Sequence, residues 1–200
     1  LGKDILEIGC GIGNLTCYFK KVGRLTCVDK SSLFIQHMKI DYPDLEFYPF
    51  DITEDKVLSL AHQVFDTVIC VNVLEHIEED DKALSNMFQL LKPKGRLLLY
   101  VPALNFLYGT FDRNLGHFQR YEKGELERKL KEVGFYIEKI FFSNLLGVIG
   151  WFVNGRILRR RKISVLQTIL FDRFVPFFAC IERKIKLPLG LSLAAICTRP

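Results

Sequence analysis

The sequence lacks the cysteine patterns of a metal-binding or disulfide-bonded protein. Its six cysteines include no C-x-x-C pair and no spacing typical of a zinc site. Cys27, Cys70 and Cys197 lie inside apolar runs that predict strands, so we expect them to be buried free thiols. Free thiols indicate a reducing compartment. The sequence therefore predicts a cytoplasmic protein with no bound metal.

A strong charge excess and a membrane-spanning run are absent as well. The 200 residues carry a net charge of +5, which by itself is too small to indicate a nucleic-acid partner. The apolar stretch 145–153 is too short to cross a bilayer, because Ser143 and Asn144 precede it and Arg156 soon follows. A hydrophobic share of 49% nevertheless predicts an ordered single domain, residues 1–200, with a sizeable core.

Residues 4–16 predict a buried strand, a tight turn and the start of a helix. Gly9, Gly11 and Gly13 allow the backbone to turn sharply and to approach a ligand closely, because no Cβ intervenes. A strand, a glycine turn and a helix form the first half of a βαβ nucleotide-binding unit. A glycine loop in some other α/β protein is the alternative at this point.

The spacing of the turn and one carboxylate indicate which nucleotide it binds. A dinucleotide fingerprint is G-x-G-x-x-G, but here Asn14 holds the place of the third glycine. Glu7 precedes the first glycine, where a carboxylate repels a pyrophosphate and attracts an ammonium group. S-adenosylmethionine carries an ammonium group and no phosphate. The turn therefore favours S-adenosylmethionine over NAD.

Two further acids follow predicted strands. Asp29 ends the second strand at nearly the interval after Gly11 at which a carboxylate meets ribose hydroxyls. Asp51 and Ile52 follow the third strand and suit an adenine, because the carboxylate accepts from the exocyclic amine while the isoleucine packs on the ring. In both cases a helix-capping acid is the alternative.

Histidines lie at the carboxyl end of the predicted sheet. Residues 64–71 form a nearly continuous apolar run, which is typical of a strand covered on both faces. His76 follows it, where open α/β sheets place their chemistry, although a packed or capping histidine is the alternative. The long connection 102–121 adds polar and aromatic residues, among them Asn105, Tyr108, Asp112, Asn114, His117, Arg120 and Tyr121.

With these motifs the sequence resembles the class I S-adenosylmethionine-dependent methyltransferases, in the small-molecule branch that includes ubiquinone-biosynthesis-like enzymes. The resemblance is carried by residues 6–13, 28–29, 51–52, 65–68, 74–76 and 91–97. It implies an α/β Rossmann-like three-layer sandwich with a seven-stranded, mostly parallel sheet. The cofactor-binding core is residues 1–142, and residues 190–198 are the antiparallel last strand.

The resemblance also implies the site residues. The glycine turn lies at the methionine end of S-adenosylmethionine, Asp29 at the ribose, Asp51 and Ile52 at the adenine, and residues 72–74 beside the sulfonium. The full set is Glu7, Gly9, Cys10, Gly11, Gly13, Asp29, Lys30, Asp51, Ile52, Asn72, Val73 and Leu74. Such enzymes usually begin with a helix that helps to cover the cofactor, and we expect that helix to be missing here.

The expected reaction is methyl transfer to an oxygen or nitrogen of a small-molecule, lipid-linked or glycan-type acceptor, with release of S-adenosylhomocysteine. His117 and His76 are the candidate general bases, and Tyr121 and Arg120 are the candidates for positioning the acceptor. Residues 112–121 also resemble, more loosely, a segment of members associated with cell-envelope glycan or lipid biosynthesis. Two alternatives stay open: an inactive methyltransferase-fold scaffold at the membrane surface, and an NAD-linked oxidoreductase that the glycine spacing disfavours.

Residues 143–189 are expected to form a helical insert before the last strand. Apolar runs at 145–153 and 163–180 flank a basic cluster made of Arg156, Arg159, Arg160, Arg161 and Lys162. This pattern suits a peripheral contact of residues 145–186 with an anionic membrane, or a lid over a lipid-like substrate. Packing on the sheet or on a second subunit is equally compatible. No recognition module accompanies the basic residues, so we expect no nucleic-acid partner.

Overall fold

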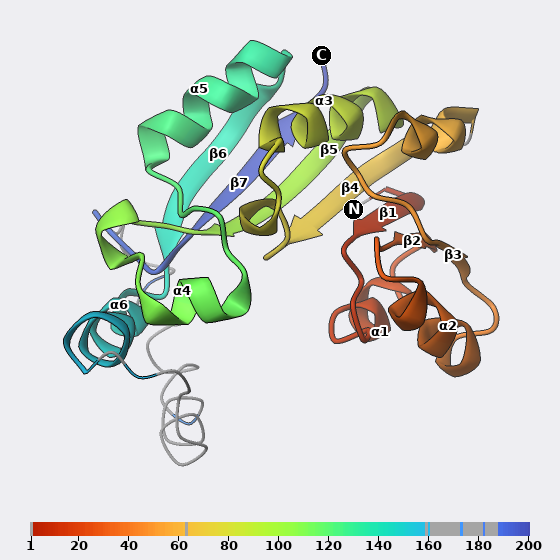
Figure 1. Ribbon diagram of the computed structural model, residues 1–200. Coiled ribbons are helices and arrows are strands. Elements are labelled where there is room, and N and C mark those ends of the chain that lie inside the picture. Colours follow the sequence, from red (N-terminus) through yellow and green to blue (C-terminus); the bar gives the residue numbers. More distant parts are fainter. Residues whose placement is uncertain (1, 63, 159, 161–172, 174–181, 183–187) are drawn as a thin grey trace.

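A seven-stranded sheet organises the protein (Figure 1). The computed structural model describes residues 2–62, 64–158, 160, 173, 182 and 188–200. The strand order is β3-β2-β1-β4-β5-β7-β6, with β7 antiparallel to both of its neighbours and the other pairs parallel. The predicted fold class is therefore confirmed. The strands are β1 (Asp4–Ile8), β2 (Arg24–Val28), β3 (Glu46–Tyr48), β4 (Phe65–Val71), β5 (Leu91–Pro102), β6 (Tyr136–Ser143) and β7 (Ser192–Thr198).

Helices connect the strands and cover both faces of the sheet. The α-helices are α1 (Thr16–Phe19), α2 (Ser32–Asp41), α3 (Asp80–Leu90), α4 (Thr110–Leu115), α5 (Lys123–Val133) and α6 (Leu145–Trp151). Short 3₁₀ segments are η1 (Asp55–His62), η2 (Leu74–His76) and η3 (Asn105–Leu107), and a π-helical segment η4 (Phe152–Ile157) follows α6. Figure 1 shows α3 and α5 lying together, away from α1 and α2.

Alternation along the strands divides the core into two layers. Leu6 and Val68 belong to the larger cluster, which also contains apolar residues of α3 and α5. Ile5 and Cys27 belong to a smaller cluster with Ile35 and other residues of α2. Successive side chains of a strand point to opposite faces. A nearly continuous apolar run is therefore what a strand covered on both faces requires.

The ends of two helices follow local chemistry. The Ser31 hydroxyl accepts a hydrogen bond from the Phe34 N–H at 3.3 Å and so begins α2 directly after β2. Helix α5 ends at Gly134, whose φ of 110° is readily adopted only by glycine. Ser31 therefore fixes the turn that follows β2, at the carboxyl edge of the sheet, whereas Gly134 fixes the turn that precedes β6, at the opposite edge.

The described part of the expected insert is helical over residues 145–157, and its first residue, Ser143, belongs to β6. Helix α6 and the segment η4 cover residues 145–157, whereas most of the second apolar run, 163–180, lies outside the described residues. Within the part of the chain that the structure describes, no helix is long and apolar enough to cross a membrane. The five described cysteines are free, and Cys27, Cys70 and Cys197 are buried as expected.

Candidate functional site

A cavity of about 570 Å³ opens at the carboxyl ends of β1, β2 and β4. Many of the residues named from the sequence line it together: Gly9, Asp29, Lys30, Asp51, Ile52, Asn72, Val73 and His76. A second cavity of about 680 Å³ lies at the opposite edge of the sheet, where Lys92 pairs with Asp66 and Arg96 with Glu138. The first is the candidate site, because open α/β sheets bind ligands beyond the carboxyl ends of their strands.

The glycine turn begins at one end of this cavity, which Gly9 lines. Gly9 has a φ of 72°, and a Cβ there would lie 2.3 Å from a methyl carbon of Val73. Gly11 has a φ of 52°, and a Cβ there would meet no heavy atom within 4 Å. The first glycine is thus required by close packing of the chain, whereas the second faces open space that a ligand can occupy.

Asp29 joins the turn to the start of α2. Its Oδ2 accepts from the Gly11 N–H at 2.9 Å, and its Oδ1 accepts from the Ser31 N–H at 2.8 Å. Each carboxylate oxygen can accept two hydrogen bonds. Both oxygens therefore keep acceptor capacity beside the cavity. The cap of α2 is Ser31 and not Asp29, so capping alone does not account for this carboxylate.

Asp51 and Ile52 lie on the loop after β3. Oδ1 of Asp51 accepts from both the N–H and the hydroxyl of Thr53, each at 2.9 Å. Ile52 is only 4% exposed and still forms part of the cavity wall. Three aromatic residues that were not expected from the sequence also line the cavity: Phe34, Phe50 and Phe118. Phe50 adjoins Asp51, and this adjacency is the only sequence signal that could have found it.

Several expected cofactor residues do not line the cavity: Glu7, Cys10, Gly11, Gly13 and Leu74. Oε2 of Glu7 accepts from the Thr16 hydroxyl at 2.7 Å and from the Cys27 thiol at 3.6 Å. Desolvation raises the pKa of Glu7. This carboxylate therefore ties β1 to the first helix and to β2, which does not fit the expected contact with an ammonium group.

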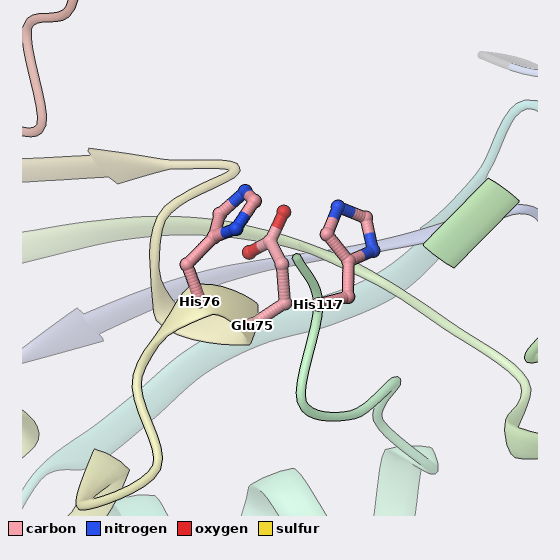
Figure 2. A group of neighbouring side chains, drawn as sticks. All are labelled: Glu75, His76 and His117. Atoms are coloured by element: carbon pink, nitrogen blue, oxygen red, sulfur yellow. The ribbon is translucent and has the colours of Figure 1, made fainter. Parts of the chain in front are cut away.

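Two histidines and a glutamate meet (Figure 2), and one of them, His76, lines the cavity. The rings of His76 and His117 lie edge to face, with centroids 4.7 Å apart. Glu75 is 1% exposed, and its Oε2 has no hydrogen-bond partner among the described residues. Desolvation raises the pKa of Glu75 to about 7 and lowers the pKa of His76. Glu75 belongs to the 74–76 motif of the sequence, and no role was expected for it.

The other two candidates, Arg120 and Tyr121, are buried. Arg120 Nε donates to Asp112 Oδ1 at 2.7 Å, its Nη1 donates to the Ala103 carbonyl at 2.9 Å, and its guanidinium stacks on Trp151. The Tyr121 hydroxyl donates to Asp80 at 2.9 Å, and burial raises its pKa. These hydrogen bonds do not fit the expectation that Arg120 and Tyr121 position an acceptor, because the polar groups of both side chains are already engaged within the protein.

A glycine turn after β1, an acid after β2 and a cavity beside β4, on a sheet with an antiparallel β7, define a class I methyltransferase architecture. Residues 6–99 match the methyltransferase domain family. Over this part the chain is similar to the class I S-adenosylmethionine-dependent methyltransferases, and S-adenosylmethionine is the cofactor of that family.

Two relatives by sequence and one solved structure illustrate the similarity. A mitochondrial ubiquinone biosynthesis O-methyltransferase of Schizosaccharomyces pombe is 37% identical over 103 residues, which cover 49% of this chain and 37% of that protein. A tRNA N(3)-methylcytidine methyltransferase of the same yeast is 35% identical over 108 residues, or 49% of this chain and 44% of that one. The chain thus spans less than half the length of these relatives.

Solved structures agree on the fold. The N-methyltransferase NodS from Bradyrhizobium japonicum, in complex with S-adenosylhomocysteine, superposes with a TM-score of 0.60 and 17% identity. The match covers 99% of this chain and 78% of that one. At this identity the likeness concerns the fold alone.

The residues present fit S-adenosylmethionine. The open space at Gly11 admits a ligand close to the backbone, and both oxygens of Asp29 can accept a further hydrogen bond. Asp51 keeps Oδ2 as an acceptor that no described residue uses. Together these groups offer hydrogen-bond acceptors for a diol and for an amine along one apolar cavity.

Proposed function

We propose that the protein transfers the methyl group of S-adenosylmethionine to an oxygen or nitrogen atom of a small-molecule acceptor. The observation that carries this proposal is the single cavity that gathers Gly9, Asp29, Asp51 and His76 from four separate loops. When bound, the cofactor supplies a methyl group already activated by a sulfonium. The protein has to bind the cofactor and the acceptor, align the two reacting atoms and exclude water.

The residues around the cavity divide this work. Asp29 accepts from the ribose hydroxyls, and Asp51 accepts from the adenine amine while Ile52 packs against the ring. Gly9 and Val73 line the end of the cavity nearest the turn. These are the roles expected from the sequence, and the positions of the side chains along one cavity support them.

His76 and His117 act on the acceptor, because His76 lines the cavity and the ring of His117 lies against it. In the simplest form, His76 takes the proton from an acceptor hydroxyl as the methyl group arrives. Its lowered pKa keeps the imidazole neutral at pH 7, which a general base requires. His117 lies edge-on to His76 and holds its orientation.

A small acceptor suits this cavity better than a nucleic acid. The lining contains four carboxylates, Asp29, Asp51, Glu78 and Glu79, against one lysine, Lys30. A polyanion would be repelled at this rim. One relative is named for tRNA methylation and another for ubiquinone biosynthesis, and the acidic rim favours the second kind of acceptor.

The described part of the insert supports an acceptor that is lipid-linked, with the protein at a membrane surface. Along α6 and η4, apolar side chains lie exposed, including Ile149 at 63%, Phe152 at 40% and Ile157 at 60%. Such a face binds the interface of a lipid bilayer through its apolar area. Sedimentation with anionic vesicles tests this part, and an Ile149→Glu, Ile157→Glu double variant should stay in the supernatant.

Calorimetric titration with S-adenosylhomocysteine tests the cofactor site. We expect binding that Asp29→Ala abolishes and that Asp44→Ala, an exposed acid on the loop before β3, leaves unchanged. NADH should not bind. Binding of NADH in place of S-adenosylhomocysteine would contradict the proposal.

Turnover is tested with methyl-labelled S-adenosylmethionine and catechols with and without an alkyl tail. Label transfer that falls in a His76→Ala, His117→Ala double variant supports methyl transfer and the role of the histidines. Cofactor binding with no transfer to any acceptor would favour an inactive scaffold, and full transfer by the double variant would exclude both histidines from the reaction.

A further inference from the structure

We propose that Glu75, His76 and His117 bind a divalent transition-metal ion at the rim of the cavity. One ligand atom from each residue lies within 4.8 Å of the other two. Glu75 and His76 come from η2, directly after β4, and His117 comes from the loop after α4 (Figure 2). Figure 2 shows the three side chains gathered around one space from two separate segments.

A hydrogen bond at one nitrogen of each ring prepares the other nitrogen as a ligand. His76 Nδ1 lies 3.2 Å from the Gly116 carbonyl, and His117 Nδ1 lies 3.1 Å from Asp112 Oδ1. A carbonyl or carboxylate oxygen can only accept, so each Nδ1 carries the proton. The lone pair of each ring is then on Nε2. A histidine whose second nitrogen donates to a carboxylate or a backbone carbonyl is the usual arrangement around a bound metal.

The orientation of His117 is itself held by buried contacts. Asp112 is 0% exposed and also accepts from Arg120 Nε at 2.7 Å, the Gly109 N–H at 2.9 Å and Trp151 Nε1 at 3.2 Å. This carboxylate is therefore fixed before it meets the imidazole. Such support is what a metal site needs in order to keep its ligands in place.

Glu75 supplies the independent observation that points to a cation. Its side chain is buried at 1% exposure, and Oε2 has no hydrogen-bond partner among the described residues. A buried polar atom without a partner is costly, and buried carboxylates are normally paired or bound to a metal. A cation between Glu75 and the two imidazoles satisfies this oxygen.

The donor set selects the kind of ion. Two imidazole nitrogens and one carboxylate oxygen suit Zn²⁺, Fe²⁺, Co²⁺ or Mn²⁺ and leave coordination positions open. Mg²⁺ and Ca²⁺ prefer oxygen ligands. Bond lengths of about 2.0–2.2 Å bring ligand atoms closer together than 4.8 Å, so we expect the side chains to close around the ion.

The position of the ion predicts its role in the reaction, and this part of the inference rests on the proposed function. His76 lines the cavity, so the open coordination positions lie beside the acceptor. A bound divalent ion lowers the pKa of a coordinated hydroxyl and orients it. The two histidines then act through the ion, and the acceptor is a molecule that ligates through a hydroxyl oxygen.

Titration of the metal-free full chain with Co²⁺, followed by visible absorption and calorimetry, tests this site. We expect one equivalent to bind with the spectrum of a nitrogen–oxygen site, and Zn²⁺ to displace it. Glu75→Gln and His117→Ala should each weaken binding by about 100-fold or more. His37→Ala, at an exposed histidine of α2, should leave binding unchanged.

The controls separate this proposal from the proposed function. S-adenosylhomocysteine binding, measured on the same samples, should survive Glu75→Gln, which shows that the variant is folded. Absence of Co²⁺ binding in a chain that binds S-adenosylhomocysteine would overturn the metal site alone. Co²⁺ binding that persists unchanged in both ligand variants, or that shows thiolate charge-transfer bands, would assign the ion to other residues and equally overturn it.

Discussion

Replacing Asp112 by asparagine should destabilise the protein strongly. The Asp112 carboxylate and the Arg120 guanidinium are 0% and 1% exposed, with 2.7 Å between Oδ1 and Nε. Burial alone would raise the pKa of Asp112, but the His117 hydrogen bond and the Arg120 charge outweigh it, and the pKa is lowered. Asp112→Asn leaves the buried arginine without its counter-charge.

Breaking a buried pair in this way costs about 3–5 kcal/mol. For a chain of this size, each kcal/mol lowers Tm by about 2–4 °C, so Asp112→Asn should melt about 6–20 °C lower. The assay is urea and thermal unfolding followed by circular dichroism. Asp55→Asn is the matched control, because Asp55 and Lys82 form an exposed pair whose side chains are 83% and 46% exposed. It should change stability by less than about 1 kcal/mol. A loss below about 1 kcal/mol in Asp112→Asn would refute the reasoning.

Three further predictions concern the turn, the opposite sheet edge and the insert. Gly9→Ala should unfold far more easily than Gly11→Ala, because its Cβ would lie 2.3 Å from a valine methyl carbon. Gly11→Ala should cost about 1–2 kcal/mol for its positive φ and chiefly weaken S-adenosylhomocysteine binding. Equal stability losses would contradict this. Backbone N–H groups of the first strand and the Lys92 ion pair lower the pKa of Asp66. The ionised Asp66 carboxylate therefore stabilises the folded state at a pH above the ordinary aspartate pKa. This stabilisation is lost as the pH falls through the lowered pKa of the folded state. Urea unfolding of Asp66→Asn should therefore differ from the parent at pH 6 and converge with it toward pH 3, and a constant difference would count against the assignment. Trp151→Phe removes a hydrogen bond to a buried carboxylate and should cost about 1.5–3 kcal/mol by the same assay; an unchanged midpoint would show that the bond contributes nothing.

Local spacing was enough to predict that three of the expected cofactor residues lie at the same edge of the sheet. Gly9, Asp29 and Asp51 each follow a strand whose apolar pattern is visible in the sequence, so their shared edge follows from parallel pairing. The acceptor side was not predictable in this way. Whether Arg120 and Tyr121 face a ligand or the core depends on partners far along the chain, Asp112 and Asp80.

Glu75 illustrates the same limit. Its neighbour His76 was singled out, but the significance of Glu75 comes from burial and from the approach of His117 across a long connection. No spacing within one segment encodes that meeting. The expectation of no metal rests on the absence of zinc-type cysteine spacing, and this criterion covers only sites whose ligands are close in sequence.

A crystal structure of the protein with S-adenosylhomocysteine tests the central claim most directly. The account predicts the ligand in the cavity at the carboxyl ends of β1, β2 and β4, with its ribose hydroxyls on Asp29 and its adenine between Asp51 and Ile52. A ligand bound instead in the cavity at the opposite edge, beside Lys92 and Arg96, would contradict the account.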